Sequence, residues 1–158
     1  MMAKAEKTNV MRLLDSKKIA YTMHFYGDTD AVSGTEVAAV LGEAPEKVFK
    51  TLVTVGRSKQ HYVFIIPVEE ELDLKKAAKA VGDKKIELVA VKELLALTGY
   101  IRGGCSPVGM KKKYPTYFDE TCILWDEIAV SAGERGHQMI LPPEPLATLI
   151  GAIFVDLT

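Results

Sequence analysis

Residues 61–68, with the sequence HYVFIIPV, constrain the fold more than any other stretch of the chain. This run is almost wholly apolar and lacks the polar alternation of a half-exposed strand, which is typical of a strand covered on both faces. Residues 48–55 also have strand-like composition, and the turn residues Gly56, Arg57 and Ser58 separate the two segments. We therefore expect a hairpin near the centre of a sheet that is covered on both faces.

Helices and further strands are expected on either side of this hairpin. Ser33 and Glu36 have the spacing of a capping box at a helix start, and Gly42 follows that helix as a stop signal. Residues 120–125 fit either a short helix or a strand. The expected helices span residues 8–18, 33–42, 73–82, 92–98 and 143–150, and the further strands span residues 20–26, 86–89, 116–118, 128–131, 137–141 and 153–157. This order lacks strict alternation of strand and helix, so we predict an α+β domain with a mixed sheet or open barrel and short flanking helices.

The composition is that of one globular domain spanning residues 1–158. Hydrophobic residues make up 48% of the chain and charged residues 26%, and the length is sufficient to bury a core. The formal net charge of −1 argues against a broad electrostatic surface for nucleic acid and leaves room for a local basic patch. The N-terminal residues 1–10 do not resemble a signal peptide, and no apolar run approaches about 20 residues. We expect a reduced cytoplasmic protein that does not associate with membranes.

Residues 99–109, GYIRGGCSPVG, form the most unusual loop in the sequence. Four glycines allow backbone conformations that other residues avoid, and they let a ligand approach the main chain closely. The loop leads into Lys111, Lys112 and Lys113, with Tyr114 and Tyr117 beside them. Lysines that bind phosphates and aromatic rings that stack on bases are typical of nucleic-acid contacts. An ordinary connection between a helix and the next strand remains an equal alternative from composition alone.

Lys50 and Cys105 are the two side chains that are the strongest candidates for a role in catalysis or ligand binding. Lys50 lies in the middle of a predicted strand, where it either points to water or holds a phosphate or a developing oxyanion as a point charge. Cys105 has no histidine near it in sequence to act as a base, so a packing role is favoured over nucleophilic catalysis, and Cys122 is expected in the core. Walker, GxGxxG, GxSxG, HExxH and paired-cysteine motifs are all absent from the sequence.

Several of these segments together resemble the YbaK family of aminoacyl-tRNA editing domains, which are related to the insertion domain of prolyl-tRNA synthetase. The resemblance rests on residues 46–52 around Lys50, the loop 99–109, the helix LKKAAK at 74–79 and the turn SAGERG at 131–136. It implies the fold of that family and a freestanding Cys-tRNA(Pro) deacylase that acts in trans, with Cys-tRNA(Cys) as a further substrate. It also implies the tRNA(Pro) 3′ end and prolyl-tRNA synthetase as partners, with no cofactor and no metal; the oligomeric state stays open.

The resemblance assigns roles to individual residues. It makes Lys50 the catalytic residue, and it makes Lys111, Lys112 and Lys113 candidates for tRNA contact. The substrate-binding residues that it implies are Tyr26, Thr51, Gly103, Gly104, Ser106 and Ser131. Two departures concern the wall of the pocket, because residues 26–34 form a shorter segment than in typical members and Ser33 stands where an aromatic residue is expected.

The resemblance also implies a mechanism. The amides of Gly103 and Gly104 would form an oxyanion hole for the ester carbonyl, and Lys50 would position the tRNA 3′ end. The thiol of the substrate cysteine would attack its own ester, which agrees with the absence of a Ser-His-Asp or Cys-His set in the sequence. Three alternatives remain: a non-catalytic module that binds the tRNA end or a synthetase, editing of Ala-tRNA(Pro), and thiol redox chemistry at Cys105.

Overall fold

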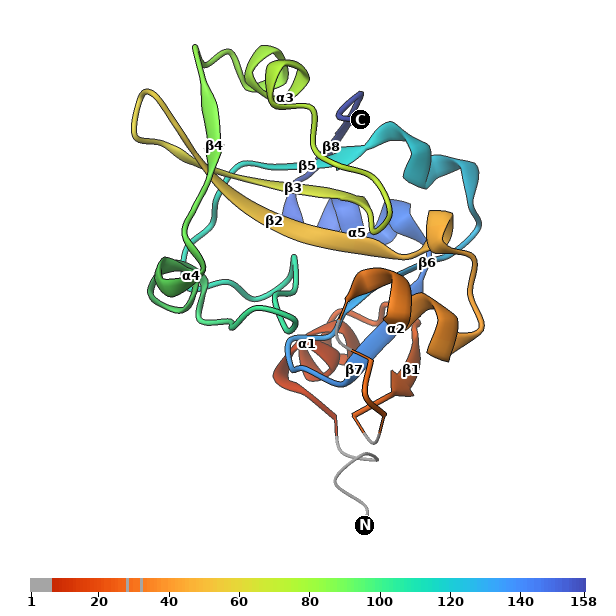
Figure 1. Cartoon of the computed structure of the whole chain (residues 1–158). Coiled ribbons are helices and arrows are strands. Elements are labelled where there is room, and N and C mark those ends of the chain that lie inside the picture. Colours follow the sequence, from red (N-terminus) through yellow and green to blue (C-terminus); the bar gives the residue numbers. More distant parts are fainter. Residues whose placement is uncertain (1–6, 28, 32) are drawn as a thin grey trace.

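A five-stranded sheet surrounds the predicted hairpin in the computed structural model, which describes residues 7–27, 29–31 and 33–158 (Figure 1). The long strands β2 and β3 pair antiparallel, β4 pairs antiparallel with β2, and β5 and β8 extend the sheet in parallel beyond β3. The sheet order is β4 (Ile86–Leu88), β2 (Phe49–Gly56), β3 (His61–Pro67), β5 (Thr116–Asp119) and β8 (Ile153–Val155). The hairpin prediction is therefore confirmed.

Strand β3 lies in the middle of this sheet and is buried on both faces, as its apolar sequence predicts. Val63 and Ile65 pack into the main core, which also contains side chains from the N-terminal and C-terminal helices and from a second sheet. Phe64 and Ile66 point the other way and pack against Ala77 and its neighbours in α3. All four β3 side chains are fully buried, so the absence of polar alternation follows from the two covering layers.

The second sheet has three antiparallel strands, with β7 (His137–Leu141) between β1 (Thr22–Phe25) and β6 (Ile128–Ser131). A single parallel bridge between Val48 and Ala129 connects it to the beginning of β2. A small apolar cluster of Ala38, Val48, Val68, Ala129 and Ile140 fills this junction. The α+β prediction is confirmed, and the described residues form two sheets of which neither closes into a barrel.

The helices begin and end close to the predicted residues. Thr8 Oγ1 accepts a hydrogen bond from the Met11 N–H, and Ser33 and Glu36 form the expected capping box. The helices are α1 (Asn9–Ser16), α2 (Gly34–Leu41), α3 (Leu74–Val81), α4 (Val91–Thr98) and α5 (Pro143–Ile150), with short 3₁₀ helices at η2 (Pro45–Lys47) and η3 (Glu120–Leu124). The ambiguous segment 120–125 is thus mostly helical. None of the helices in the described residues is long and apolar enough to cross a membrane.

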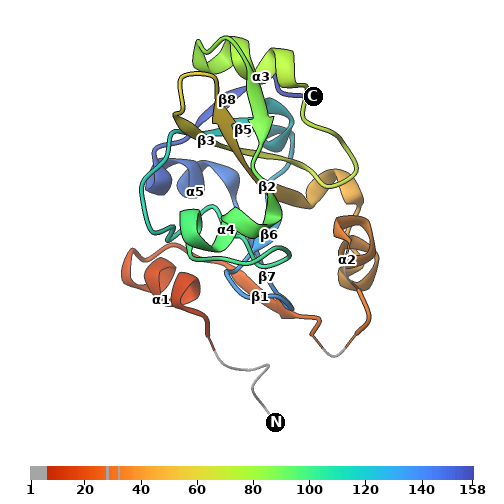
Figure 2. The same cartoon turned by 60° about the vertical axis from the view of Figure 1, so that its left-hand side comes forward.

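The loop that follows α4 lies against the turn between β6 and β7 of the small sheet. In both Figure 1 and Figure 2 it leaves α4 and reaches toward α2, close to the small sheet. Tyr100 holds this loop closed, because its hydroxyl donates to the Val108 carbonyl oxygen across the turn. The glycine-rich segment is therefore an ordered part of the fold.

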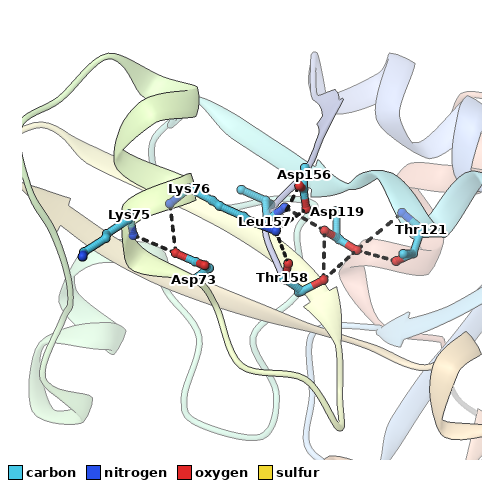
Figure 3. Close-up of polar contacts among 8 residues, drawn as sticks. All are labelled: Asp73, Lys75, Lys76, Asp119, Thr121, Asp156, Leu157 and Thr158. Carbon is cyan, nitrogen blue, oxygen red and sulfur yellow. Dashed lines mark hydrogen bonds and ion pairs between the residues drawn. The ribbon is translucent and has the colours of Figure 1, made fainter.

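A buried carboxylate fastens the C-terminal segment to the sheet (Figure 3). Asp119, at the end of β5, is fully buried and accepts hydrogen bonds from the Leu157 N–H at 2.9 Å and the Thr121 hydroxyl at 2.5 Å. Lys76 in α3 donates to the Thr158 carbonyl oxygen at 2.5 Å and pairs with Asp156 at the surface. These contacts attach α3 and β8 to the same edge of the sheet.

Replacing Asp119 by alanine should lower the free energy of unfolding by about 2–3 kcal/mol, because the buried Leu157 N–H would lose its charged acceptor. The matched change Asp156→Ala should cost less than about 1 kcal/mol, since the ion pair of Asp156 with Lys76 is solvent-exposed. Urea denaturation followed by circular dichroism measures both values. Equal losses in the two variants would show that Asp119 does not anchor the C-terminal segment.

Candidate functional site

A cavity of about 710 Å³ lies where the two sheets meet. Its walls include the first half of β2, the beginning of α2, the loop after α4 and the turn between β6 and β7, together with Tyr26 after β1 and Val68 after β3. Residues far apart in the sequence therefore contribute to one site. Of the residues assigned by sequence, Tyr26, Lys50, Thr51, Gly103 and Ser131 line this cavity.

Lys50 is the central charge of the cavity. It pairs with Ile66 in the β2–β3 ladder, and its half-buried side chain lines the cavity beside Leu52 rather than pointing only to water. Burial lowers the pKa of the Lys50 ammonium, while Glu71 and Glu70 act in the opposite direction. No hydrogen bond or ion pair joins the Lys50 ammonium to another residue in the described part of the chain. This cation is consequently available to an anionic or electron-rich ligand.

Two buried polar atoms of the cavity wall also have no partner. Thr51 Oγ1 and Gln138 Oε1 are both inaccessible to solvent and form no hydrogen bond with any described residue. Leaving such an atom unpaired costs about 1–3 kcal/mol, and both residues contribute to the wall of the cavity. Ser131 faces Gln138 across the β6–β7 ladder, and its Oγ accepts from the Gly133 N–H at 3.3 Å.

Tyr26 lines one side of the cavity. Tyr26 is buried, its N–H donates to the Gly136 carbonyl oxygen at 2.7 Å, and its own carbonyl oxygen accepts from the Thr29 hydroxyl. Ser33 lines the cavity as the N-cap of α2, so the position where an aromatic residue was expected has a capping role. Residues 28 and 32 of this segment lie outside the described residues.

The glycine loop contributes less of its backbone to the cavity than expected. Gly103 lines the cavity with φ of +87°, a conformation that suits glycine. The Gly104 amide, however, donates to the Ile101 carbonyl oxygen at 3.0 Å. It is therefore not free to bind an ester oxygen, and the predicted pair of amide donors is reduced to Gly103. Ser106 is also fully buried outside the cavity lining, where its Oγ accepts from the Val108 N–H and shapes the loop.

Two arginines that the sequence analysis did not select stand at the cavity. Arg102 precedes Gly103 in the glycine loop, and Arg135 lies in the turn after β6. The guanidinium of Arg135 donates to the Arg102 carbonyl oxygen at 2.8 Å, which joins the two loops. A Cβ atom on Gly104 would lie only 2.9 Å from the Arg135 backbone nitrogen, so a glycine is required for this close approach. Both arginines belong to motifs that the sequence had already singled out, whereas Gln138 belongs to none.

The lysine run lies at other clefts. Lys111 lines a hollow beside the beginning of α1, and Lys112 and Lys113 line another beside α5. The Tyr114 ring is not available to stack on a base. The Tyr114 ring is buried and its hydroxyl donates to the Leu97 carbonyl oxygen at 2.7 Å, while Tyr117 stacks on Phe64.

Cys105 lines the cavity and is poorly suited to act as a nucleophile. Its side chain is 8% exposed and packs in the main core, and burial raises the pKa of its thiol to about 12. Two of the histidines pack elsewhere, His61 against Tyr114 and His137 against Phe25. Cys122 is fully buried, as predicted. The geometry thus offers a cationic, partly desolvated cavity without an activated protein thiol.

Known proteins resemble the chain over most of its length. The model of the aminoacyl-tRNA editing domain matches residues 28–149. EbsC of Enterococcus faecalis, whose name proposes a Cys-tRNA(Pro)/Cys-tRNA(Cys) deacylase, is 47% identical over 154 residues, which are 97% of this chain and 94% of EbsC. A proline–tRNA ligase of Shouchella clausii is 31% identical over 111 residues, 70% of this chain and 19% of the ligase.

Solved structures show the same fold. The crystal structure of a proposed trans-editing enzyme for prolyl-tRNA synthetase superposes with a TM-score of 0.81 at 26% identity. That alignment covers 97% of this chain and 99% of the other.

Alkylation tests the state of the cysteines. At about pH 8, a thiol whose pKa is about 12 is ionised in roughly one molecule in ten thousand. Cys105 and Cys122 should therefore resist iodoacetamide in the folded protein for a time that fully modifies glutathione, and both should react in concentrated urea. Mass spectrometry of tryptic peptides counts the modified sites. Rapid modification of Cys105 in the folded protein would instead indicate an activated thiolate.

Proposed function

Because this chain belongs to the aminoacyl-tRNA editing domain family, we propose that it is a trans-editing deacylase that removes cysteine from Cys-tRNA(Pro), with Cys-tRNA(Cys) as a further substrate. The near-complete match to EbsC supports both this substrate class and a single editing domain over residues 1–158. The observation that carries the proposal is Lys50, a partly desolvated cation without a partner in a cavity of suitable size. A cavity of this volume is in the range of small-ligand sites.

In this proposal the cavity holds the aminoacyl ester of the terminal adenosine. Lys50 binds the 3′ end through a ribose hydroxyl or a phosphate, and Thr51 beside it forms part of the wall that the ester meets. Arg102 and Arg135 lie on the two loops at the cavity and offer guanidinium groups to the preceding phosphodiester. Tyr26, Gly103 and Ser131 form the remaining wall, and Gly104 and Ser106 support the loop from behind.

The substrate supplies the nucleophile. Its cysteine sulfur attacks the ester carbonyl, a carbon–sulfur bond forms, and the bond from the carbonyl carbon to the ribose oxygen breaks. The thiol proton passes to the leaving ribose oxygen, so that tRNA and a cysteine thiolactone are released, and water then opens the thiolactone. The buried and un-ionised Cys105 supports this route because the cavity has no other thiol among its described residues. This chemistry also explains why cysteine would be preferred over alanine.

The surroundings of the cavity bear on the partners. Lys111, Lys112 and Lys113 are exposed and are suited to contact the tRNA outside the cavity. A net charge of −1 predicts weak intrinsic affinity for tRNA, so delivery by prolyl-tRNA synthetase is part of the proposal. The site of action is then the cytoplasm, where tRNAs are charged. The rival function is a non-catalytic module that binds the tRNA end without turnover.

Substitution of Lys50 distinguishes catalysis from binding alone. Lys50→Met should lower kcat/KM for Cys-tRNA(Pro) at least about 100-fold, because it removes the charge that positions the 3′ end. Its melting temperature should equal or exceed that of the wild type, since burial disfavours the ammonium. Lys79→Met, at an exposed position of α3, is the matched control and should keep full activity.

A substrate panel completes that experiment. Wild-type protein should deacylate Cys-tRNA(Pro) and Cys-tRNA(Cys) and leave Pro-tRNA(Pro) intact. If the protein released alanine from Ala-tRNA(Pro) faster than cysteine from Cys-tRNA(Pro), the alanine-editing alternative would be favoured. Tight tRNA binding without release of any amino acid would support the non-catalytic module.

Blocking the substrate thiol tests the mechanism. S-methylcysteinyl-tRNA(Pro) should be deacylated at least about 100-fold more slowly than Cys-tRNA(Pro), because it lacks the attacking sulfur nucleophile. Cys105→Ala should retain most of the wild-type rate on Cys-tRNA(Pro). Loss of all activity in Cys105→Ala with an unchanged melting temperature would refute substrate assistance and implicate the protein thiol.

A further inference from the structure

The end of the β2–β3 hairpin that lies away from the cavity carries cations that the proposed function does not use. Exposed basic residues stand on two adjacent loops there, Arg57 and Lys59 in the hairpin turn and Lys84 and Lys85 just before β4. Arg57, Lys59 and Lys85 line one hollow of about 380 Å³. These three residues are called the hairpin-tip cluster below.

Hydrogen bonds join the two loops that carry the cluster. The Arg57 N–H donates to the Lys85 carbonyl oxygen at 3.0 Å. Asp83, in the loop before β4, accepts from the Ser58 hydroxyl at 2.5 Å and from the Tyr62 hydroxyl at 3.1 Å. The three cations are therefore presented by one connected part of the fold, which sets the spacing between the places where they are attached.

Carboxylates neutralise only part of the cluster. The Lys85 ammonium pairs with Glu87 at 3.0 Å, and both side chains are mostly exposed. The Arg57 guanidinium and the Lys59 ammonium form no hydrogen bond or ion pair within residues 7–27, 29–31 and 33–158. Because the whole chain has a formal net charge of −1, the cluster is a local excess of positive charge on a slightly acidic protein. A local basic patch of this kind is typical of a site for phosphodiester groups.

The backbone at Lys59 favours a role for its side chain. Lys59 has φ of +77°, and its N–H donates to the Gly56 carbonyl oxygen at 2.9 Å to close the turn. Hairpin turns usually have glycine at such a left-handed position, because a Cβ atom crowds the backbone there. A lysine at a position that suits glycine is better explained by its charge than by the geometry of the turn.

The location of the cluster fits a ligand that extends beyond the cavity. Arg57 follows β2 directly and is seven residues from Lys50, which corresponds to about 20 Å of extended strand. β4 pairs only with residues 54–56 of β2, so the edge of the sheet leads from the cavity past β4 to the cluster (Figure 1 and Figure 2). This distance exceeds the length of an aminoacyl adenosine. A ligand that meets both places must therefore continue as a chain of nucleotides.

We propose that the hairpin-tip cluster binds the phosphodiester backbone of the tRNA acceptor stem, several nucleotides before the 3′ end that enters the cavity. This inference rests on the proposed function, and it adds a contact separate from the lysine run at residues 111–113. Contacts to phosphates position a nucleic acid without reading its bases. The cluster therefore raises the affinity for charged tRNA in general, and the choice of amino acid is left to the cavity.

The test compares Cys-tRNA(Pro) with a cysteinyl-CCA trinucleotide, which can enter the cavity but lacks the acceptor stem. In the absence of synthetase, Arg57→Gln/Lys59→Gln/Lys85→Gln should lower kcat/KM for Cys-tRNA(Pro) about 10-fold at low salt. The loss should lie in KM, with kcat within about twofold of the wild type, and kcat/KM for the trinucleotide should change less than about twofold. The slope of log kcat/KM against log salt concentration should become shallower by at least about one, because fewer counterions are released.

Two controls separate this place from surface charge in general and from the stability of the turn. Arg12→Gln/Lys17→Gln/Lys18→Gln removes the same types of exposed cation at α1, which lies far from the hairpin turn in Figure 1 and Figure 2, and should keep full activity. Lys18 also has a positive φ, of +59°, so this control matches Lys59 in backbone conformation. Lys59→Gly should melt at or above the wild-type temperature and still lose about two- to threefold in kcat/KM for Cys-tRNA(Pro).

Four outcomes would overturn the inference. They are full activity of the hairpin-tip variant on Cys-tRNA(Pro), a loss confined to kcat, an equal loss on the trinucleotide, and an equal loss in the α1 control. A loss that appears only when prolyl-tRNA synthetase is added would show that the cluster binds an acidic protein surface instead. Wild-type protein that releases no amino acid from any charged tRNA would refute the proposed function itself, whereas an active wild type with any of these outcomes would refute the role of the cluster alone.

Discussion

The parallel bridge between Val48 and Ala129 is the contact on which the site depends. Val48 also accepts the Val68 N–H at 2.8 Å, so the beginning of β2 is attached to both the hairpin and the small sheet. The apolar cluster around it, which includes Ala38 from α2, excludes water from the junction. The main core also joins the two sheets, but this attachment fixes the beginning of β2 against the small sheet. Lys50 lies two residues along β2, on a stretch that β4 does not pair with, so the attachment places it at the junction of the sheets.

Polar groups left without partners at this junction oppose folding, and the surrounding core compensates for them. Lys50, Thr51 and Gln138 contribute a desolvated cation and two unpaired oxygens to one cavity. The main cluster behind the cavity is built from fully buried side chains of both sheets, α1 and α5. Because packed interiors resist local collapse, these groups stay separated in the cavity. Such preorganisation lowers the cost of ordering them when a ligand arrives.

Local signals in the sequence predicted the secondary structure well, for identifiable reasons. Ser33 with Glu36, and Asp73 before α3, satisfy backbone donors within a single turn of helix, so their effect does not depend on distant residues. The apolar run in β3 predicted burial on both faces in the same way. Residues 120–125 stayed ambiguous because a 3₁₀ helix has no strong periodic signature. The family resemblance supplied Lys50, which periodicity alone left undecided.

The site residues were predicted less accurately than the secondary structure, because several distant segments of the chain form the cavity together. The sequence pattern that joined Lys111 to Tyr114 suggested a base-stacking surface, but the hydrogen bond from Tyr114 to Leu97 and the burial of its ring place it in the core. From the sequence, the Gly104 amide was expected to bind the ester oxygen, but in the structure it donates to the Ile101 carbonyl oxygen. Such competing partners are set by tertiary contacts that sequence spacing does not contain.

The sequence by itself determined the helices and strands, the central buried hairpin, the glycine loop and the family, because capping, periodicity and motif order act over short ranges of chain. Only the tertiary structure decided which of the marked residues share a cavity. It brought Arg102 and Arg135 together through one hydrogen bond and placed Gln138 opposite Ser131 with an unpaired oxygen. The physical reason is that strand register and sheet packing, rather than distance along the chain, select the neighbours of a buried polar atom.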